Sequence, residues 1–278
     1  MFRSLVLGAV QGLTEFVPIS SSAHLVLVPF LVGWPVPDLV FDVAVHLGTA
    51  LAVILYFARD LGGIVAGTAR TAVGRAREGD RGQARIALLL AIGSIPAAVA
   101  GFLLQGVFER LFTTTEDVER IGAPVVALFL LGTAALMWGA EMVYSRSRRA
   151  RRDVDGVGVL DALTIGLFQA LAIAPGISRS GATISAGIFR GLSRDAAARF
   201  SFLLALPAIA GAGLVALPDL PPGADVAQIA GATAVSALTG FAAIAFLLRY
   251  LRTRDLKPFA VYCVLASAVA LGFWFQVK

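Results

Sequence analysis

The sequence predicts an all-α polytopic membrane protein, with six transmembrane helices and two re-entrant helix–loop–helix hairpins related as an inverted repeat. Of the 278 residues, 58% are hydrophobic and only 15% are charged, whereas a soluble domain is nearer half apolar and a quarter charged. Six apolar runs are long enough to cross a bilayer, and two further apolar stretches are broken at their centres. The length favours a single integral membrane domain that covers residues 1–278.

The six spans follow from the length of their apolar runs. A helix needs about 20 mostly apolar residues to cross the hydrocarbon core. Helix is the expected state because backbone groups in lipid must be satisfied within the segment. The qualifying runs are 38–58, 84–106, 121–144, 196–217, 226–249 and 257–277.

The two hairpins follow from the interrupted stretches. Residues 2–33 are broken by the sequence at 18–22, and residues 160–190 by the sequence at 175–181. Each half is too short to span, but each pair is long enough to enter the membrane and turn back. Irregular backbone at this depth survives only where protein buries it or where it lines a wet cavity. The N-terminus begins like a signal peptide, but Gln11, Glu15 and Pro18 interrupt the run, so we expect it to be retained.

The basic residues predict the orientation. Loops rich in Lys and Arg stay in the cytoplasm, which places both chain ends outside and makes the two hairpins enter from opposite sides. The formal net charge of +5 is explained by this topology, so nucleic acid is not an expected partner. The basic loops are 59–85, 145–155, 190–199 and 249–257.

A weak internal repeat supports the opposite entry of the hairpins. At an offset of 158 residues, the first hairpin matches the second at six positions, all within the two broken segments. The halves would cover about 1–145 and 156–278. Inverted repeats with broken helices place their binding site near the membrane midplane, where the loops meet. The matched pairs are Gly8 with Gly166, Gln11 with Gln169, Leu13 with Leu171, Ile19 with Ile177, Ser20 with Ser178 and Ser22 with Ser180.

Each hairpin carries one charge at membrane depth, Glu15 in the first and Arg179 in the second. A charge there costs about 2.5–3.5 kcal/mol on insertion scales, so it needs a partner or a wet cavity. One polar pocket between the two loops would accommodate both. Gln11 and Glu15 are four residues apart and share one helix face, where together they would hold a divalent cation through oxygen ligands. Glu15 is alternatively a general base, and Gln11 alternatively a packing residue.

Three hydroxyls and an imidazole follow Glu15 at the first break. Ser20, Ser21 and Ser22 precede a short helix, so at least one of them is expected to be its N-cap. Ser21 or Ser20 is also a candidate nucleophile towards phosphorus, with Glu15 or His24 accepting its proton. His24 is alternatively the acid that protonates the leaving group, or the nucleophile itself. These roles stay open at the level of the sequence.

The second break is typical of a phosphate-binding loop. Glycines permit close approach of backbone, a helix begins just afterwards, and a helix N-terminus binds phosphate through its free N–H groups. Arg179 can grip phosphate oxygens with two donors. The substrate-binding candidates in and around both loops are Gln11, Ser20, Ser22, Gly176, Ser178, Ser180, Gly181 and Thr183.

Three more polar residues are assigned structural roles. His46 and Asp42 share one face of a helix; we expect His46 to be a helix-packing residue rather than part of the pocket, and Asp42 to be solvated. Cys263, the single cysteine, is expected to be a buried thiol.

The residues from Gln11 to His24 resemble the first motif of the bacterial undecaprenyl-diphosphatases, the bacitracin resistance proteins. Pro175–Thr183 is similar to the second motif of that family, and Phe200–Pro207 is similar to a third segment. The resemblance covers essentially the whole chain in length and hydrophobic layout. It implies hydrolysis of a C55 isoprenyl diphosphate to the monophosphate at the outer membrane face of a bacterium, which recycles the lipid carrier for peptidoglycan, and a requirement for Mg²⁺ or Ca²⁺.

By the same resemblance, four residues correspond to functional positions: Glu15, Ser21, His24 and Arg179. Gln11 stands at a metal or substrate position where many members have Glu, which weakens any mechanism that needs two carboxylates. Two rival functions remain on the fold alone, a transporter or flippase of an isoprenyl phosphate lipid and a non-catalytic lipid-binding protein. The sequence leaves the oligomeric state open, with a homodimer as one option.

Overall fold

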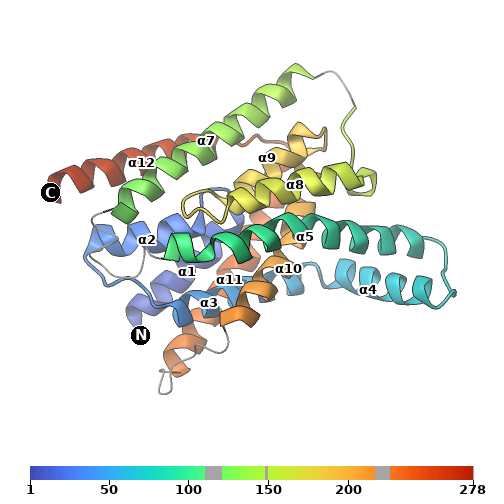
Figure 1. Cartoon of the computed structure of the whole chain (residues 1–278), viewed down its shortest axis with the longest axis horizontal. Helices are drawn as coiled ribbons and strands as arrows, with labels where there is room; N and C mark the ends of the chain where they lie inside the picture. The colour runs from blue at the N-terminus through green and yellow to red at the C-terminus, as the bar shows by residue number, and fades with distance from the viewer. Residues whose placement is uncertain (110–120, 148–149, 217–225, 278) are drawn as a thin grey trace.

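The computed structural model describes residues 1–109, 121–147, 150–216 and 226–277. Within these residues the chain forms eleven α-helices and one 3-10 turn, in agreement with the predicted all-α class. They pack side by side in an elongated bundle whose two termini lie at the same end (Figure 1). The helices are α1 (Phe2–Phe16), α2 (Ser21–Val32), α3 (Leu39–Tyr56), α4 (Ala58–Ala72), α5 (Asp80–Glu109), α7 (Ala123–Arg146), α8 (Val159–Leu171), α9 (Arg179–Phe189), α10 (Arg194–Ala216), α11 (Val226–Leu251) and α12 (Lys257–Val277), with the 3-10 turn at Val154–Gly156.

Five helices are long and apolar enough to cross a membrane: α3, α5, α7, α11 and α12. They coincide with five of the six predicted spans, and the chain is a polytopic membrane protein. The sixth predicted span, 196–217, forms α10. Helix α10 does not meet the same requirement for a membrane span over residues 194–211, whose side chains the structure describes. Three charged residues, Arg194, Asp195 and Arg199, occupy its first two turns.

Both interrupted stretches form helix–loop–helix hairpins, as predicted. Helix α1 ends at Phe16, and Val17 is extended with ψ of 130°, the conformation that a following proline imposes on its neighbour. The second break contains Gly176 at φ of 107°, a backbone conformation that glycine adopts without steric cost. A side chain there would also collide with the Val126 carbonyl oxygen, 2.5 Å from an added Cβ.

The hairpins pack against helices from the other half of the chain. Helix α1 lies along α11, and α8 lies along α5. Both contacts are close because both involve glycine. A Cβ added at Gly8 would stand 2.4 Å from the Ala232 oxygen, and one at Gly166 would stand 2.1 Å from the Gly93 oxygen. The pair α7 and α12 closes one side of the bundle.

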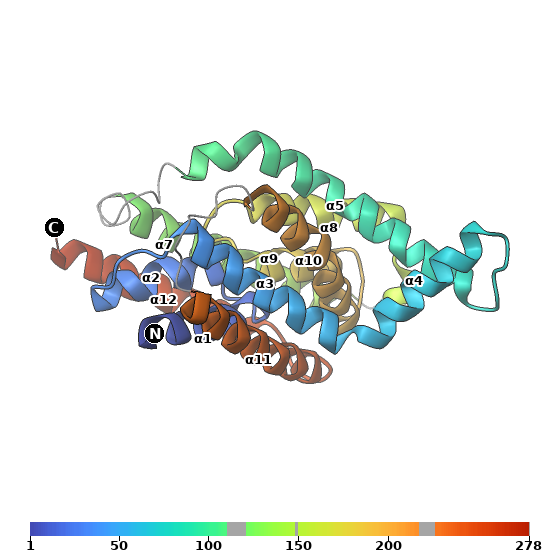
Figure 2. The same cartoon turned by 90° about the horizontal axis from the view of Figure 1, so that it is seen from below.

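The prediction of a loop at 59–85 was wrong. This segment contains α4, which turns back along the start of α5 and projects beyond the bundle (Figure 2). Asp80 accepts two hydrogen bonds of 2.7 Å from the Arg70 guanidinium and one of 2.8 Å from the backbone N–H of Arg77. A search for membrane-length apolar runs cannot find α4, because it is short and mostly polar on one face.

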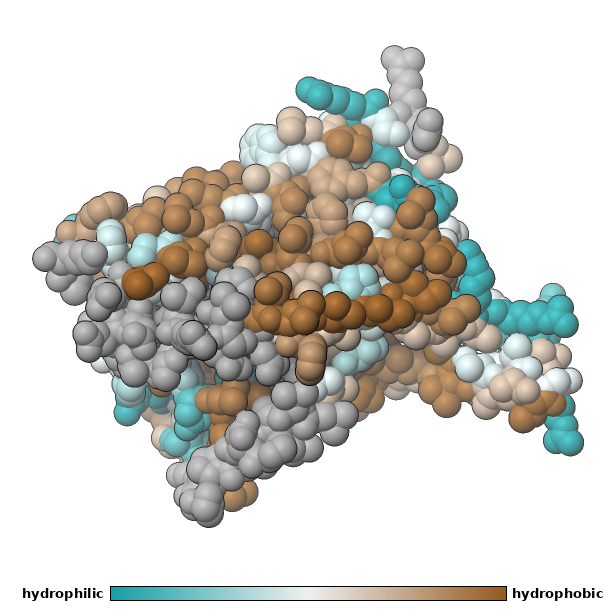
Figure 3. Space-filling view, in the orientation of Figure 1, coloured by the Kyte–Doolittle hydropathy of each residue, from teal (hydrophilic) through white to brown (hydrophobic). Residues whose placement is uncertain are grey.

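The four basic loops meet at the end opposite the termini. Arg152 and Arg190 both donate to Asp161 at the start of α8, and Arg194 pairs with Glu141 near the end of α7. Figure 3 shows hydrophilic side chains gathered at this end, while the visible flank of the bundle is broadly hydrophobic.

Candidate active site

The loops of the two hairpins meet and form one polar site, as the sequence predicted. Arg179 Nη2 donates to Glu15 Oε1 over 2.8 Å. The backbone N–H of Gly176 donates to Ser22 Oγ over 3.3 Å. Residues that are 164 and 154 positions apart in the chain are thus in direct contact.

Two helix N-termini converge at this site. Ser20 is the N-cap of α2 and accepts from the backbone N–H of Ala23 over 3.3 Å. Ser178 is the N-cap of α9 and accepts from Gly181 N–H over 3.0 Å. Helix N-termini carry partial positive charge and free N–H groups, so the arrangement is suited to an anion.

Glu15 is the centre of the hydrogen-bond network. Its side chain is 6% exposed, and its Oε2 accepts from Gln11 Nε2 over 3.0 Å and from the Ser21 hydroxyl. Its Oε1 accepts from Arg179. A carboxylate held by these donors is placed to take the proton of the Ser21 hydroxyl.

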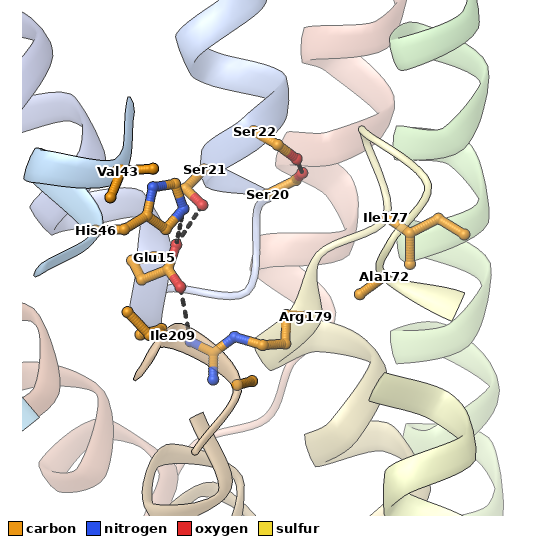
Figure 4. A pocket seen from close by; sticks show the side chains of 11 residues that line it. Glu15, Ser20, Ser21, Ser22, Val43, His46, Ala172, Ile177, Arg179 and Ile209 are labelled. Carbon is orange, nitrogen blue, oxygen red and sulfur yellow. Dashed lines mark hydrogen bonds and ion pairs between the residues drawn. The ribbon is translucent and has the colours of Figure 1, made fainter. Parts of the chain in front are cut away.

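A cavity of about 240 Å³ opens beside these groups (Figure 4). Its apolar wall comes from α3, α10 and the α8–α9 loop. The guanidinium of Arg179 and the carboxylate of Glu15 lie next to one another, with Ser21 and His46 on the other side of the carboxylate. The polar wall consists of Glu15, Ser20, Ser21, Ser22, His46 and Arg179, and the apolar wall of Val43, Ala172, Ile177, Ala208 and Ile209.

His46 lies in the cavity wall, so the expectation that it only packs between helices was wrong. Its Nδ1 lies 2.7 Å from the backbone oxygen of Asp42 and must donate to it, because a carbonyl only accepts. Its Nε2 faces Glu15 Oε2 at 3.8 Å. The helical spacing of Asp42 and His46 was visible in the sequence, but nothing local showed that this face of α3 meets α1.

His24 is oriented differently from the other predicted residues. It is buried and is not among the residues that line the cavity. Its Nδ1 lies 2.7 Å from the Ser20 carbonyl oxygen, and its Nε2 lies 2.7 Å from Tyr262 Oη on α12. Both ring nitrogens are therefore engaged away from Ser21 and Glu15.

The remaining predicted residues of the second hairpin stabilise the loop through hydrogen bonds and packing outside the cavity. Ser178 and Ser180 share a hydrogen bond of 3.2 Å, and Thr183 donates to the Arg179 carbonyl and bonds with Ser201 Oγ at 2.6 Å. A Cβ added at Gly181 would stand 3.1 Å from side-chain atoms of Thr133 and Ser178, so little space is left there. None of these four lines the cavity.

Thr133 on α7 was not found from the sequence. Its hydroxyl donates to the Gly176 oxygen over 3.1 Å and accepts from Ser178 N–H over 2.8 Å. It therefore fixes both sides of the glycine turn that presents Arg179. A lone Thr in an apolar helix gives no local signal of such a role.

A divalent cation fits this site only with help from a ligand. Gln11 Oε1 is buried and has no hydrogen-bond partner among the described groups, so one amide oxygen is free beside Glu15. The described residues contain no cluster of three or more His, Cys, Asp or Glu suited to a metal. Mg²⁺ is commonly held by one or two protein oxygens together with substrate phosphates and water, and that is the donor set available here.

Comparison with known proteins agrees with the resemblance in the motifs. The family model described as bacitracin resistance protein BacA matches residues 4–269. An undecaprenyl-diphosphatase of Alcanivorax borkumensis is 45% identical over 98% of this chain and 98% of its own. Those of Thermomicrobium roseum and Geobacter sulfurreducens are 44% and 40% identical, covering 98% and 99% of this chain and 97% and 98% of theirs. The chain therefore belongs to the BacA family of bacitracin resistance proteins.

Proposed function

We propose that this protein hydrolyses undecaprenyl diphosphate to undecaprenyl phosphate and inorganic phosphate in the bacterial cytoplasmic membrane. The observation that carries the proposal is the contact of the Ser21 hydroxyl and the Arg179 guanidinium with the two oxygens of Glu15, where two helix N-termini converge. Full-length relatives carry the name undecaprenyl-diphosphatase. The apolar flank of the bundle suits a substrate with a long isoprenoid chain.

The proposed reaction assigns one role to each group. Ser21 Oγ attacks the terminal phosphorus while Glu15 takes its proton, and the bond from that phosphorus to the bridging oxygen breaks. Isoprenyl monophosphate leaves, and water then hydrolyses the phosphoserine to release phosphate. Arg179 and the N–H groups of α2 and α9 stabilise the negative charge that spreads over the phosphoryl oxygens. Direct attack by a water that Glu15 activates is the competing path.

The divalent cation of the proposal would be held by Glu15 and by the free oxygen of Gln11, with the diphosphate completing its ligands. When bound, it would neutralise phosphate charge. Arg179 already pairs with Glu15, so the carboxylate has a partner of opposite charge without the cation. Gln11 in place of a second carboxylate lowers the negative charge that a diphosphate meets on entering.

The proposed topology makes α1–α2 and α8–α9 re-entrant hairpins of an inverted repeat, with halves of about 1–145 and 156–278. Their helices have 15, 12, 13 and 11 residues, each shorter than the roughly 20 that a span needs. Both chain ends and the cavity mouth would be outside and the basic loops in the cytoplasm. The reaction would then recycle the lipid carrier for peptidoglycan at the outer face.

Labelling of single cysteines tests this topology. The only native cysteine, Cys263, is buried, so its background labelling should be low. An impermeant thiol reagent should label Phe2→Cys in intact spheroplasts and Arg75→Cys only after permeabilisation. Both positions are exposed. Labelling of Arg75→Cys from outside would refute the orientation.

The activity is tested with purified protein in detergent. Release of inorganic phosphate from undecaprenyl diphosphate should depend on added Mg²⁺ or Ca²⁺ and should be lost in Arg179→Gln. Arg249→Gln, a change at an exposed arginine of α11 outside the cavity, is the matched control. Absence of phosphate release from the wild-type protein would refute the proposal.

A flippase for an isoprenyl phosphate lipid is the second candidate. Helix α1 of the first half packs on α11 of the second, and α8 of the second half packs on α5 of the first. This arrangement favours a flippase, since two interlocked halves with broken helices are a transporter architecture. Movement of a labelled isoprenyl phosphate across liposomes, without phosphate release, would select this function instead.

A further inference from the structure

We propose that Tyr262 is a positioning residue for the hydrolysis proposed above: acting through His24, it fixes the peptide between Ser20 and Ser21. Tyr262 lies on α12, far from the hairpin in sequence, yet its Oη is 2.7 Å from His24 Nε2. Its ring stacks on the imidazole at 5.7 Å with an interplanar angle of 13°. Neither ring lines the cavity, so the pair acts on the site indirectly.

The hydrogen-bond partners determine which atoms of His24 and Tyr262 donate a proton. The Ser20 carbonyl can only accept, so His24 Nδ1 carries a proton and donates to it. In the neutral imidazole Nε2 is then an acceptor, and the Tyr262 hydroxyl is its donor. The series of hydrogen bonds therefore begins at Tyr262 Oη, passes through His24 and ends on the Ser20 carbonyl. This leaves no free lone pair on His24 with which to act as a base.

Ser20 is a position that needs such support. Its φ is 72°, and it is the only residue other than glycine with positive φ in the described part of the chain. A residue in such a region is strained and persists only where the surroundings hold it. Both polar groups of Ser20 are held here. Its hydroxyl accepts from Ala23 N–H and bonds with Ser22 Oγ, and its carbonyl accepts from the backbone N–H of His24 and from His24 Nδ1.

The orientation of the Ser20 carbonyl also sets the direction of the Ser21 N–H. A trans peptide is planar, so its N–H points opposite to its C=O. With the carbonyl directed at His24, the Ser21 N–H is directed out of the N-terminus of α2, where Ser20, Ser21 and Ser22 line the cavity. The same turn places Ser21 Oγ on Glu15 Oε2. A rotation of this peptide would move both the oxyanion donor and the hydroxyl.

Tyr262→Phe is the informative variant, because it keeps the ring stack and removes only the hydroxyl. Since Tyr262 does not touch the substrate, kcat should fall about tenfold, the factor that corresponds to about 1.4 kcal/mol, while KM stays within about twofold. Tyr56→Phe is the control: Tyr56 packs edge-to-face against Phe57 and Phe241 at one end of α3, outside the cavity. It should keep wild-type kcat.

A double-mutant cycle tests the route through His24. If Tyr262 acts through His24, adding Tyr262→Phe to His24→Ala should lower kcat no further. An equal fall of kcat in both backgrounds would overturn the proposal. A wild-type kcat in Tyr262→Phe would also overturn the proposal, whatever the kcat of His24→Ala.

A spectroscopic measurement keeps this test separate from the proposed function. The chain has two histidines, so ¹⁵N-histidine labelling gives two imidazole spin systems, and His46→Gln assigns them. His24 should be the tautomer protonated at Nδ1, and its Nε2 resonance should shift in Tyr262→Phe but not in Tyr56→Phe. A His24 protonated at Nε2, or one unaffected by Tyr262→Phe, refutes the network even if the protein has another activity. Wild-type protein that shows the network but releases no phosphate refutes the function instead.

Discussion

Replacing Glu15 with Gln tests the site most directly, because it removes one charge and keeps the shape. Glu15 accepts from three donors, namely Gln11, Ser21 and Arg179. An amide has only one acceptor oxygen. Whichever way the amide is turned, its NH₂ group faces a donor, so either Arg179 or the pair Gln11 and Ser21 loses its acceptor.

The expected magnitude follows from the role of the lost carboxylate. A general base typically contributes about 10²–10⁴-fold to the rate, which is about 3–5 kcal/mol of transition-state stabilisation. In Glu15→Gln we therefore expect kcat for phosphate release from undecaprenyl diphosphate to fall by about 10²–10⁴-fold. Stability should fall too, because breaking a buried ion pair costs about 3–5 kcal/mol.

Glu141 provides a matched control for the loss of stability. Glu141 is 1% exposed, pairs with Arg194 and accepts from the Leu256 N–H over 3.0 Å at the basic end of the bundle. Glu141→Gln should lower the unfolding temperature by a similar amount while the folded protein keeps wild-type kcat. If Glu15→Gln kept kcat within about threefold of wild type, far less than a base contributes, Glu15 would not be the base. Equal losses of kcat in both variants would trace the effect to folding.

Four further predictions follow from individual contacts. Ser21→Ala should lower kcat by at least about 10³-fold if Ser21 is the nucleophile, as loss of a catalytic nucleophile does in other enzymes; near-normal turnover would instead support attack by water. A chelator should abolish phosphate release from undecaprenyl diphosphate, and Mg²⁺ should restore it without any change in the circular dichroism spectrum; full activity in the chelator would remove the cation from the mechanism. Gly166→Ala should destabilise the protein by about 1–3 kcal/mol through overpacking, whereas Gly62→Ala, which meets nothing within 4 Å, should not, as measured by thermal unfolding. The Arg70 guanidinium and the N–H of Arg77 hold the pKa of Asp80 well below its ordinary value of 3.8, so the stability that Asp80 adds is complete above about pH 5 and is lost progressively as the pH falls towards the lowered pKa. The gap in unfolding temperature between wild type and Asp80→Asn should narrow steadily on acidification below about pH 4, and a gap that is unchanged at about pH 2 would contradict this.

Much of the site could be predicted because the membrane makes polar residues conspicuous. Glu15 and Arg179 stand in apolar stretches, where each needs a partner, and the breaks at Pro18 and Pro175 mark where helices must end. These local facts were enough to predict that the two loops meet. The residues alone left both Ser20 and Ser21 as candidate nucleophiles, and the family resemblance singled out Ser21.

Other features depended on how the helices rotate and which neighbours they meet. His46 turned out to face Glu15, whereas His24 turns away from the cavity towards Tyr262. Thr133 proved to hold the glycine turn. In each case the partner lies on a distant segment, and the local pattern carries no information about it.

By itself, the sequence determined the all-α membrane class, the two broken helices and the pairing of one acid with one arginine, because the cost of polar groups in hydrocarbon acts on each residue wherever it is. Only the tertiary structure decided that 59–85 contains a helix, and which of the two histidines lines the cavity. Those outcomes depend on the packing of helices against one another, since side chains from distant segments set the rotation of each helix about its axis.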